Sequence, residues 1–306
     1  MALIDGFPNV WVGHATNAAA RTGCTVILSP QGATAGVAVR GGAPGTRETD
    51  LLQPGNLVEQ VHAILLTGGS AFGLAAADGV MRWLYERQHG FATSVVKVPI
   101  VPAAVLFDLA VGDAVWPDAA MGYAACEDAY HSPIDWGRVG AGTGATIGKL
   151  FGAGRVTRGG IGMARVAAAE QLVTAIVAVN AYGHVVDPTT NEIIAGSRLP
   201  DGSLADTVQH LLQGPPPALA LEHTTIGCVL TTARLDKAAC ARVASIAHDG
   251  LARTIRPAHT HLDGDALFAL AVAPPAAPPA DSLAIGVAAA EAVAQAVIHA
   301  VRAAQA

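Results

Sequence analysis

The stretch Glu222-His223-Thr224-Thr225-Ile226-Gly227-Cys228-Val229-Leu230 decides how the rest of the chain is interpreted. Its two adjacent threonines stand at the start of an apolar, β-branched run, which is typical of a buried strand. The segment just upstream, Gly214-Pro215-Pro216-Pro217, fits neither a helix nor a central strand because of its prolines. We therefore expect a loop that delivers a threonine hydroxyl to the first residue of a buried strand.

A hydroxyl in this place has two interpretations. A threonine at a strand edge is common because β-branched residues favour strands, and on the threonine alone this ordinary role is favoured. If the bond between His223 and Thr224 were cut, however, Thr224 would carry a free α-amine beside its own hydroxyl. An α-amine ordinarily has a pKa of about 7.7–8.0. One residue would then supply both the nucleophile and the general base.

The composition indicates a large, tightly packed α/β protein. Of 306 residues, 52% are hydrophobic and only 14% are charged. The net charge of −6, with no long basic run, makes nucleic acid an unexpected partner. The sequence has no uninterrupted apolar run long enough to span a membrane and no signal-peptide pattern. We therefore expect no membrane partner and a cytoplasmic location.

The four cysteines are widely scattered and form no CxxC pair. This spacing indicates free, partly buried thiols in a reducing compartment. A catalytic role for Cys228 is the weaker alternative, because this residue falls inside the strand that follows Thr224 and free cysteines are commonly buried.

Hydrophobic patterning predicts strands on both sides of the proline-rich loop. The upstream strands cover residues 10–13, 24–28, 33–39, 61–66, 95–101 and 172–179, and residues 183–186 form a hairpin with the last of these. Ser70 is expected to be the N-cap of a helix. Downstream we expect a strand over 225–231, a helix from about 236 to 255, a strand over 266–272 and a last helix capped by Asp281 or Ser282. The linker over 197–221 would join strands of the same sheets, so that residues 1–306 form a single domain.

Two residues upstream of the loop are candidate partners of Thr224. Lys149 ends the glycine-rich segment 140–149, but a phosphate loop would need glycine where Thr143 stands and Ser or Thr where Leu150 stands. The alternative is that the lysine charge lowers the pKa of a nearby amine. Asn180 follows an apolar strand, and it is either an ordinary turn residue or a side-chain donor in an oxyanion hole.

A third cluster of polar residues precedes the last predicted strand. His259, His261, Asp263 and Asp265 alternate, so they share one face of an extended segment. Two imidazoles and two carboxylates suit zinc or a related ion. They also suit a polar loop, or a pair of aspartates that orients the nucleophile. The residues alone leave these three interpretations open.

Taken together, five segments resemble the L-aminopeptidase/D-esterase family, which includes β-aminopeptidases and nylon-oligomer hydrolases. The resemblance extends from Asn9 to about Ala271, and the motifs stand in the family's order. The segments are Gly68-Gly69-Ser70-Ala71-Phe72-Gly73-Leu74, Val98-Pro99-Ile100-Val101-Pro102-Ala103-Ala104-Val105, Thr224-Thr225-Ile226-Gly227, Ala247-His248-Asp249-Gly250-Leu251-Ala252-Arg253 and Asp263-Gly264-Asp265.

The resemblance implies an N-terminal-nucleophile hydrolase with a four-layer α/β/β/α sandwich. The precursor would cut itself once between His223 and Thr224, giving fragments 1–223 and 224–306. Both fragments would stay in one body that assembles as a homo-oligomer, often a tetramer of such pairs. We therefore expect no cofactor and no metal. The expected substrates are small peptides, amino amides or esters, β-peptides and 6-aminohexanoate oligomers.

The resemblance also assigns roles to individual residues. Thr224 matches the nucleophile, Lys149 the lysine near it and Asn180 the asparagine that supports the oxyanion. The paired acidic positions behind the nucleophile match Asp263 and Asp265, which reduces the weight of the metal interpretation. The substrate-binding positions match Gly69, Ser70 and Phe107.

Two positions depart from the family's pattern. His223 stands where the family often has Asn or Gly, and Phe107 stands where nylon-oligomer hydrolases carry a tyrosine. The bulk of His223 before the nucleophile would slow self-cleavage. Its imidazole could equally assist the cleavage by moving a proton near neutral pH. The alternatives to a self-processing amidase are a related acetyl transferase that uses the same threonine, a metal-dependent hydrolase and an unprocessed, non-catalytic homologue.

Overall fold

The computed structural model describes residues 3–214, 223–274 and 276–306. Its main sheet has the strand order β10-β11-β14-β16-β2-β4-β7-β3, and β1 also pairs with β2. The bounds are β1 (Trp11–Asn17), β2 (Thr22–Val39), β3 (Thr46–Arg47), β4 (Gln60–Thr67), β7 (Ala103–Val105), β10 (Gly160–Ala168), β11 (Gln171–Asn180), β14 (Thr224–Thr231) and β16 (Ala266–Ala271).

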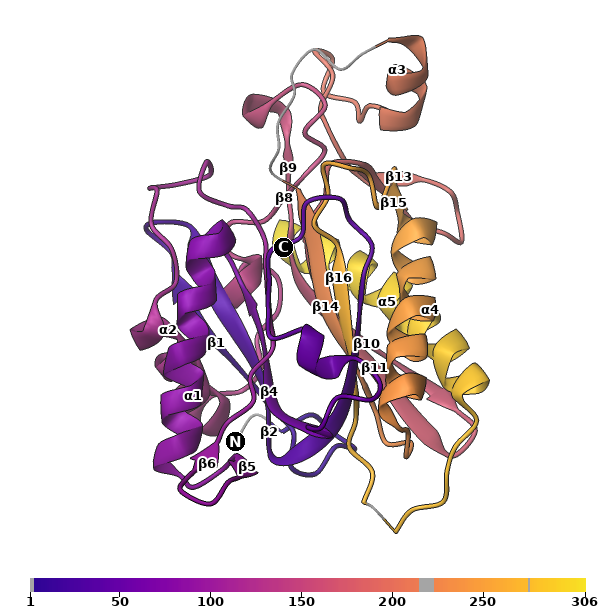
Figure 1. Cartoon of the computed structure of the whole chain (residues 1–306). Coiled ribbons are helices and arrows are strands. Elements are labelled where there is room, and N and C mark those ends of the chain that lie inside the picture. Colours follow the sequence, from indigo (N-terminus) through magenta and orange to yellow (C-terminus); the bar gives the residue numbers. More distant parts are fainter. Residues whose placement is uncertain (1–2, 215–222, 275) are drawn as a thin grey trace.

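The long strand β2 changes partners along its length. Its first half pairs antiparallel with β1 and β4, and its second half pairs antiparallel with β16. The register with β4 shifts between Leu28 and Ala33. As a result β2 belongs to two groups of strands, one with β1 and β4 and the other with β10, β11, β14 and β16, which lie face to face in Figure 1.

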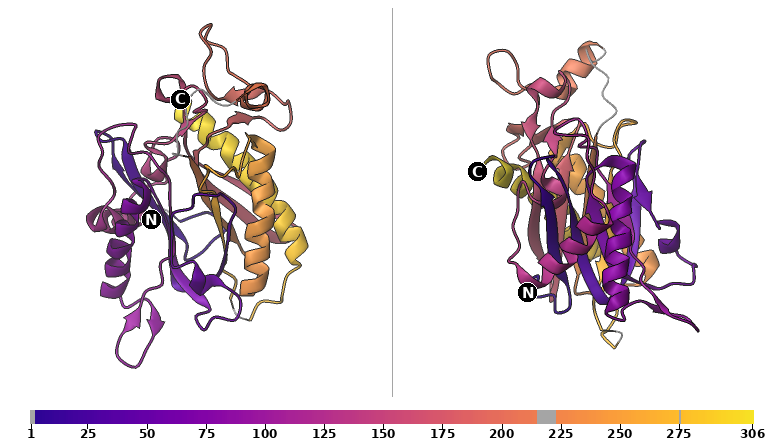
Figure 2. Two further views of the ribbon diagram at one scale, coloured as in Figure 1. Left: turned by 45° about the horizontal axis from the view of Figure 1, so that its top comes forward. Right: turned by 90° about the vertical axis from the view of Figure 1, so that its left-hand side faces the viewer.

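Helices cover the two outer faces. The helices α1 (Ala76–Glu86) and α2 (Ala119–His131) pack over the group that contains β1 and β4. The helices α4 (Lys237–Thr254) and α5 (Ser282–Gln305) pack over β2, β16, β10 and β11. Figure 1 shows the two pairs on opposite sides, and the turned view in Figure 2 keeps this arrangement. The predicted four-layer α/β/β/α sandwich is confirmed.

Three apolar cores fill the three spaces between the four layers. In β14, Ile226, Cys228 and Leu230 point into the core between the two strand groups, whereas Val229 points toward α4 and α5. This alternation follows from the two-residue period of a strand. Both faces of β14 are therefore buried, which explains its almost continuous apolar sequence. The third core lies between α1, α2 and their strands.

The last helix, α5, is alanine-rich because it lies very close to the sheet. A Cβ atom added to Gly162 of β10 would stand 2.3 Å from the backbone nitrogen of Ala300. By length and composition alone, α5 is apolar enough to cross a membrane, but 72% of its most apolar window is buried inside the protein. The core helix of a compact protein gives the same signal, and no other helix in the described ranges gives it.

The predicted elements around β14 are confirmed. The Asp236 side chain accepts a hydrogen bond from Ala239 N at the start of α4, and Asp281 accepts one from Leu283 N at the start of α5. The strand β14 pairs antiparallel with β11 and parallel with β16. Strands before and after the predicted linker therefore join one sheet.

Four predictions about local structure are wrong. The segments 24–28 and 33–39 form the single strand β2, because the chain changes partners there without leaving the sheet. Ser70 caps no helix, because its φ is +53° and it begins the 3₁₀ turn η2 (Ser70–Ala75) that precedes α1. Residues 183–186 pair with β13 (Ile193–Ala195) and β15 (Ile255–Arg256) rather than with β11. Of 95–101, only β6 (Lys97–Val98) is a strand, since Pro99 has no N–H to continue a ladder.

Short elements form the ends of the sandwich. One end, at the top of Figures 1 and 2, carries the three-stranded sheet β13-β12-β15 and α3 (Thr207–Gln213). The predicted linker 197–221 thus contains a helix, and its residues 215–221 lie outside the described ranges. The remaining bounds are β5 (Phe91–Ala92), β8 (Thr146–Ile147), β9 (Thr157–Arg158), β12 (His184–Val186), β13 (Ile193–Ala195), β15 (Ile255–Arg256), η1 (Asp50–Leu52), η3 (Gly140–Gly142) and η4 (Ala153–Arg155).

Candidate active site

Thr224 is the first residue of β14, as the sequence predicts. It lies directly opposite Asn180 of β11 in the antiparallel register, and 6% of its surface is exposed. Its hydroxyl Oγ1 donates a hydrogen bond of 2.5 Å to the carbonyl oxygen of His223. The candidate nucleophile therefore stands next to the carbonyl group of the bond that self-cleavage would break.

The same carbonyl oxygen is held from a second side. The backbone N–H of Gly264 donates to His223 O over 2.9 Å, and His223 forms a parallel bridge with Asp263. A Cβ atom on Gly264 would lie 2.6 Å from Thr224 Oγ1 and 2.6 Å from the carbonyl oxygen of Ala43. Only a glycine fits between these oxygen atoms. Gly264 was not among the residues predicted to form the site, although a glycine between two aspartates is the signal that marks it.

Asp265 fixes the chain one residue after the nucleophile. Its Oδ1 accepts the backbone N–H of Thr225 over 2.8 Å. Its Oδ2 accepts the backbone N–H of His259 over 3.1 Å and lies 2.7 Å from Nδ1 of the same histidine. A charge-assisted hydrogen bond of this kind is stronger than a neutral one. His259 thus positions Asp265, and Asp265 positions the start of β14.

The Asp263 carboxyl bonds within its own turn rather than to β14. Its Oδ2 accepts hydrogen bonds from the backbone N–H and the hydroxyl of Thr260, at 2.8 and 2.6 Å. Burial, reinforced by the charge of Asp265, raises the pKa of Asp263 to about 6. Asp263 contributes to the site indirectly, because the backbone N–H of its neighbour Gly264 donates to the carbonyl oxygen of His223.

The metal interpretation of this segment finds no support in the geometry. The Asp265 carboxyl is hydrogen-bonded to His259, and the Asp263 carboxyl accepts a hydrogen bond from Thr260. The His261 side chain is exposed. Within the described ranges, no three His, Cys, Asp or Glu side chains are grouped so that they could hold an ion. The pairing of His259 with Asp265 serves the backbone of β14 instead.

Lys149 and Asn180 meet beside Thr224. The ammonium Nζ of Lys149 donates to Asn180 Oδ1 over 2.7 Å and to the Asn180 carbonyl oxygen over 3.2 Å. The amide nitrogen Nδ2 of Asn180 donates to the carbonyl oxygen of Phe107 over 3.0 Å. The structure thus brings together three residues from positions 149, 180 and 224, while the donation of Asn180 to an oxyanion stays a prediction.

A small cavity of about 130 Å³ opens beside the nucleophile. His223, Thr224, Ser70 and Phe107 all line it. Two of the three predicted substrate-binding residues are therefore at the site. The third, Gly69, shapes the adjacent turn: its φ is +83°, and its N–H donates to Asp108 Oδ1 over 2.7 Å. Burial raises the pKa of the Asp108 carboxyl to about 6.

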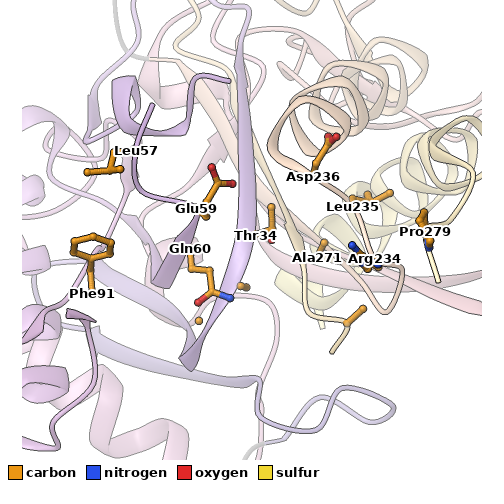
Figure 3. A pocket seen from close by; sticks show the side chains of 13 residues that line it. Thr34, Leu57, Glu59, Gln60, Phe91, Arg234, Leu235, Asp236, Ala271 and Pro279 are labelled. Atoms are coloured by element: carbon orange, nitrogen blue, oxygen red, sulfur yellow. The ribbon is translucent and has the colours of Figure 1, made fainter. Parts of the chain in front are cut away.

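A larger cavity lies elsewhere. It measures about 540 Å³, and Figure 3 shows Glu59 and Gln60 on one side with Arg234 and Asp236 on the other. Ala271, which also lines it, pairs with Thr231 at the far end of β14. Thr231 lies seven residue steps after Thr224, which is roughly 23 Å along a strand. This cavity is therefore not part of the site around Thr224.

The cysteines have no role in the site. All four are free, as predicted, and they are fully rather than partly buried. Burial raises the pKa of the Cys228 thiol far above its usual range, so this side chain is not a thiolate nucleophile at neutral pH.

A family model described as peptidase family S58 matches residues 3–306. The chain belongs to peptidase family S58. It is therefore a hydrolase of peptide or amide bonds, as the arrangement around Thr224 suggests.

The relatives found by sequence comparison include aminopeptidases and oligomer hydrolases. An uncharacterized aminopeptidase from Mycobacterium leprae is 49% identical over 263 residues, which cover 81% of this S58 chain and 70% of the relative. A 6-aminohexanoate-oligomer endohydrolase from a Kocuria strain is 33% identical over 270 residues, covering 86% of this chain and 73% of the relative. The resemblance inferred from the sequence motifs is confirmed.

Solved structures confirm the fold of this S58 peptidase. The L-aminopeptidase D-Ala-esterase/amidase of Ochrobactrum anthropi, whose title describes a variant of the Ntn hydrolase fold, superposes with a TM-score of 0.71. The superposition covers 97% of this chain and 85% of that one, at 22% identity. A Burkholderia β-aminopeptidase gives a TM-score of 0.69 at 24% identity, covering 97% and 85%.

Proposed function

We propose that this S58 peptidase is a self-processing amidase that uses Thr224 as an N-terminal nucleophile. One observation carries the proposal: the Thr224 hydroxyl lies 2.5 Å from the carbonyl oxygen of His223, and the N–H of Gly264 donates to that same oxygen. A hydroxyl and a carbonyl group are thus held together, with a donor aimed at the oxygen on which negative charge develops.

Self-processing then takes two steps. Thr224 Oγ1 attacks the carbonyl carbon of His223, and the carbon–nitrogen bond between the two residues breaks. The Thr224 nitrogen takes up the proton that the hydroxyl loses, and an ester joins the two fragments. Water hydrolyses the ester, which leaves a carboxylate on His223 and restores the hydroxyl of Thr224 beside a free α-amine.

The mature reaction repeats this chemistry on a substrate amide. The Thr224 α-amine accepts the hydroxyl proton and later returns a proton to the leaving amine. The ammonium of Lys149, held against Asn180, favours the unprotonated form of that amine by charge repulsion. The Asn180 side chain and backbone N–H groups support the oxyanion, and water releases the acyl-enzyme.

The substrates we propose are small amides with a slim acyl group. The cavity at Thr224 measures about 130 Å³, well below the roughly 300–1,000 Å³ of most ligand pockets. An unbranched aminohexanoyl chain or a small amino acid fits such a space better than a bulky side chain. The names of the aminopeptidase and oligomer-hydrolase relatives support the same range.

Intact-mass measurement tests this proposal directly. We expect the wild-type chain to yield two fragments of 223 and 83 residues, Thr224→Ala to remain whole, and the matched variant Thr225→Ala to be cut. Activity toward amino-acid amides and 6-aminohexanoate oligomers should appear only where the cut occurs. An uncut wild-type chain without amidase activity, or a cut Thr224→Ala chain, would refute the proposal.

We also propose that processed pairs assemble into a homo-oligomer. The exposed rings of Phe72 and Trp116 stack at 4.6 Å beside the turn that carries Ser70, and paired exposed aromatics are enriched at protein interfaces. Light scattering during gel filtration should give a multiple of the chain mass, and a lower multiple for Phe72→Ser. A monomeric wild type would contradict this assembly.

A further inference from the structure

A third cavity lies on the Lys149 side of the nucleophile and has no role in the mechanism above. It measures about 300 Å³, the lower end of the range for small-ligand pockets. Four cationic side chains line it: Arg21, Arg138, Arg158 and Lys149. They come from the β1–β2 turn, the segment before η3, the strand β9 and the segment after β8.

The three guanidinium groups of this cavity have no ion-pair partner among the described residues. No acidic side chain is among the described residues that line the cavity. Partial burial and the charges of Arg158 and Arg21 lower the pKa of Arg138, so these guanidinium groups repel one another. Such an arrangement of like charges is stabilised when an anion enters.

The cavity is connected to the catalytic machinery through two residues. Phe107 lines both this cavity and the small one that contains Thr224. Lys149 lies in the cavity wall and donates to Asn180, which stands opposite Thr224 in the sheet. A substrate whose scissile amide lies at Thr224 therefore has a second, cationic subsite next to it.

We propose that the cavity lined by Arg21, Arg138 and Arg158 binds a carboxylate of the amide substrate. The planar guanidinium group pairs with a carboxylate through two parallel hydrogen bonds, which gives both affinity and orientation. A carboxylate is the anion that peptides and aminoalkanoate oligomers carry. The inference rests on the proposed amidase function and makes it more specific: the enzyme prefers amides that carry a negative charge near the bond it cuts.

Binding of peptides that cannot be hydrolysed tests the subsite separately from the chemistry. Two pairs of peptides, each with a reduced scissile amide, are titrated by calorimetry against the wild-type protein: alanyl-glutamyl amide with alanyl-glutaminyl amide, and glutamyl-alanyl amide with glutaminyl-alanyl amide. Each pair differs by one carboxylate, on the leaving side or on the acyl side. We expect at least one acidic peptide to bind about tenfold or more tightly than its neutral partner, which corresponds to about 1.4 kcal/mol.

Variants of the cavity give the controls. Adding Arg138→Gln and Arg158→Gln should bring the preference close to one and leave binding of the neutral peptides unchanged. Arg155→Gln is the matched control, because Arg155 is exposed nearby but does not line the cavity. Equal affinities within both pairs would overturn the inference, as would a preference that survives the double substitution.

Activity measurements separate the two proposals. In the processed enzyme, and with the scissile amide left intact, kcat/KM for the preferred acidic peptide should exceed that for its neutral partner, and added salt should reduce the difference. A binding preference without any hydrolysis would refute the amidase function and leave the subsite standing. Hydrolysis of both peptides at equal kcat/KM, with equal affinity, would refute the subsite alone.

Discussion

Replacing Gly264 with alanine would place a methyl group between two oxygen atoms that cannot both move away. The added Cβ would lie 2.6 Å from Thr224 Oγ1, 2.6 Å from the Ala43 carbonyl oxygen and 3.3 Å from Pro44 Cα. Overpacking of this kind costs about 1–3 kcal/mol of folding stability. Relief of the clash requires the turn to retreat, which lengthens the 2.9 Å bond from Gly264 N to His223 O.

Loss of that bond should affect cleavage more than folding. Removing one donor from a developing oxyanion costs about 2.7–4 kcal/mol, or about 10²- to 10³-fold in rate. We therefore expect Gly264→Ala to fold but to be cut about 10²- to 10³-fold more slowly than wild type. A time course of newly translated chain on denaturing gels measures the rate, and thermal unfolding reports the fold.

The matched control is Gly154→Ala. A Cβ at Gly154 would meet no atom within 4 Å, so this variant should be cut at the wild-type rate. Folded Gly264→Ala that is cut as fast as wild type would refute the reasoning, because the turn would then not hold the carbonyl group for attack.

Three further predictions concern stability and reactivity. Burial and the charge of Asp265 raise the pKa of Asp263 from 3.8 to about 6, so between these pH values the folded state holds a proton that the unfolded chain has released. The free energy of unfolding should therefore fall as pH rises from 4 to 6, by up to about 1.4 kcal/mol per pH unit. Urea unfolding should show a smaller fall for Asp263→Asn than for wild type. An identical pH dependence in wild type and variant would contradict it. Lys237 Nζ is buried and donates to the carbonyl oxygens of Leu51, Asn56 and Val58; Lys237→Met should lower the free energy of unfolding by about 2–4 kcal/mol, whereas the exposed Lys97→Met should change it little. The four buried thiols should resist a thiol-specific reagent in the folded protein and all react in denaturant; rapid labelling of the folded chain would show that the cores open.

The large elements could be predicted because local chemistry determines them. A buried run such as Ile226–Leu230 has few alternatives to a strand, and Asp236 and Asp281 begin helices because their side chains accept backbone N–H groups. The break predicted within β2 shows the limit of this logic. Pro30 and Gly32 resemble a turn, but the strand continues because each half finds its own partner, which only the tertiary structure supplies.

The candidate site divides in the same way. Thr224, Lys149 and Asn180 carry reactive side chains and could be selected from the sequence, although only the motif resemblance indicated that they meet. Gly264 and His259 were missed as positioning residues. Gly264 acts through a backbone N–H and an absent side chain, and His259 acts through Asp265. Roles of this kind depend on geometry, so residue type does not reveal them.

The strand order also determines what self-cleavage would do to the molecule. The fragment from Thr224 onward supplies β14 and β16, and these lie between β11 and β2 of the other fragment. Separating the fragments would break two strand ladders and open the cores on both faces of β14, which are almost entirely buried. Cutting the bond therefore frees two chain ends while the sheet that carries Thr224 stays intact. A nucleophile exposed by cleavage needs this arrangement, because the new α-amine is useful only if β11 continues to hold Asn180 and Lys149 beside it.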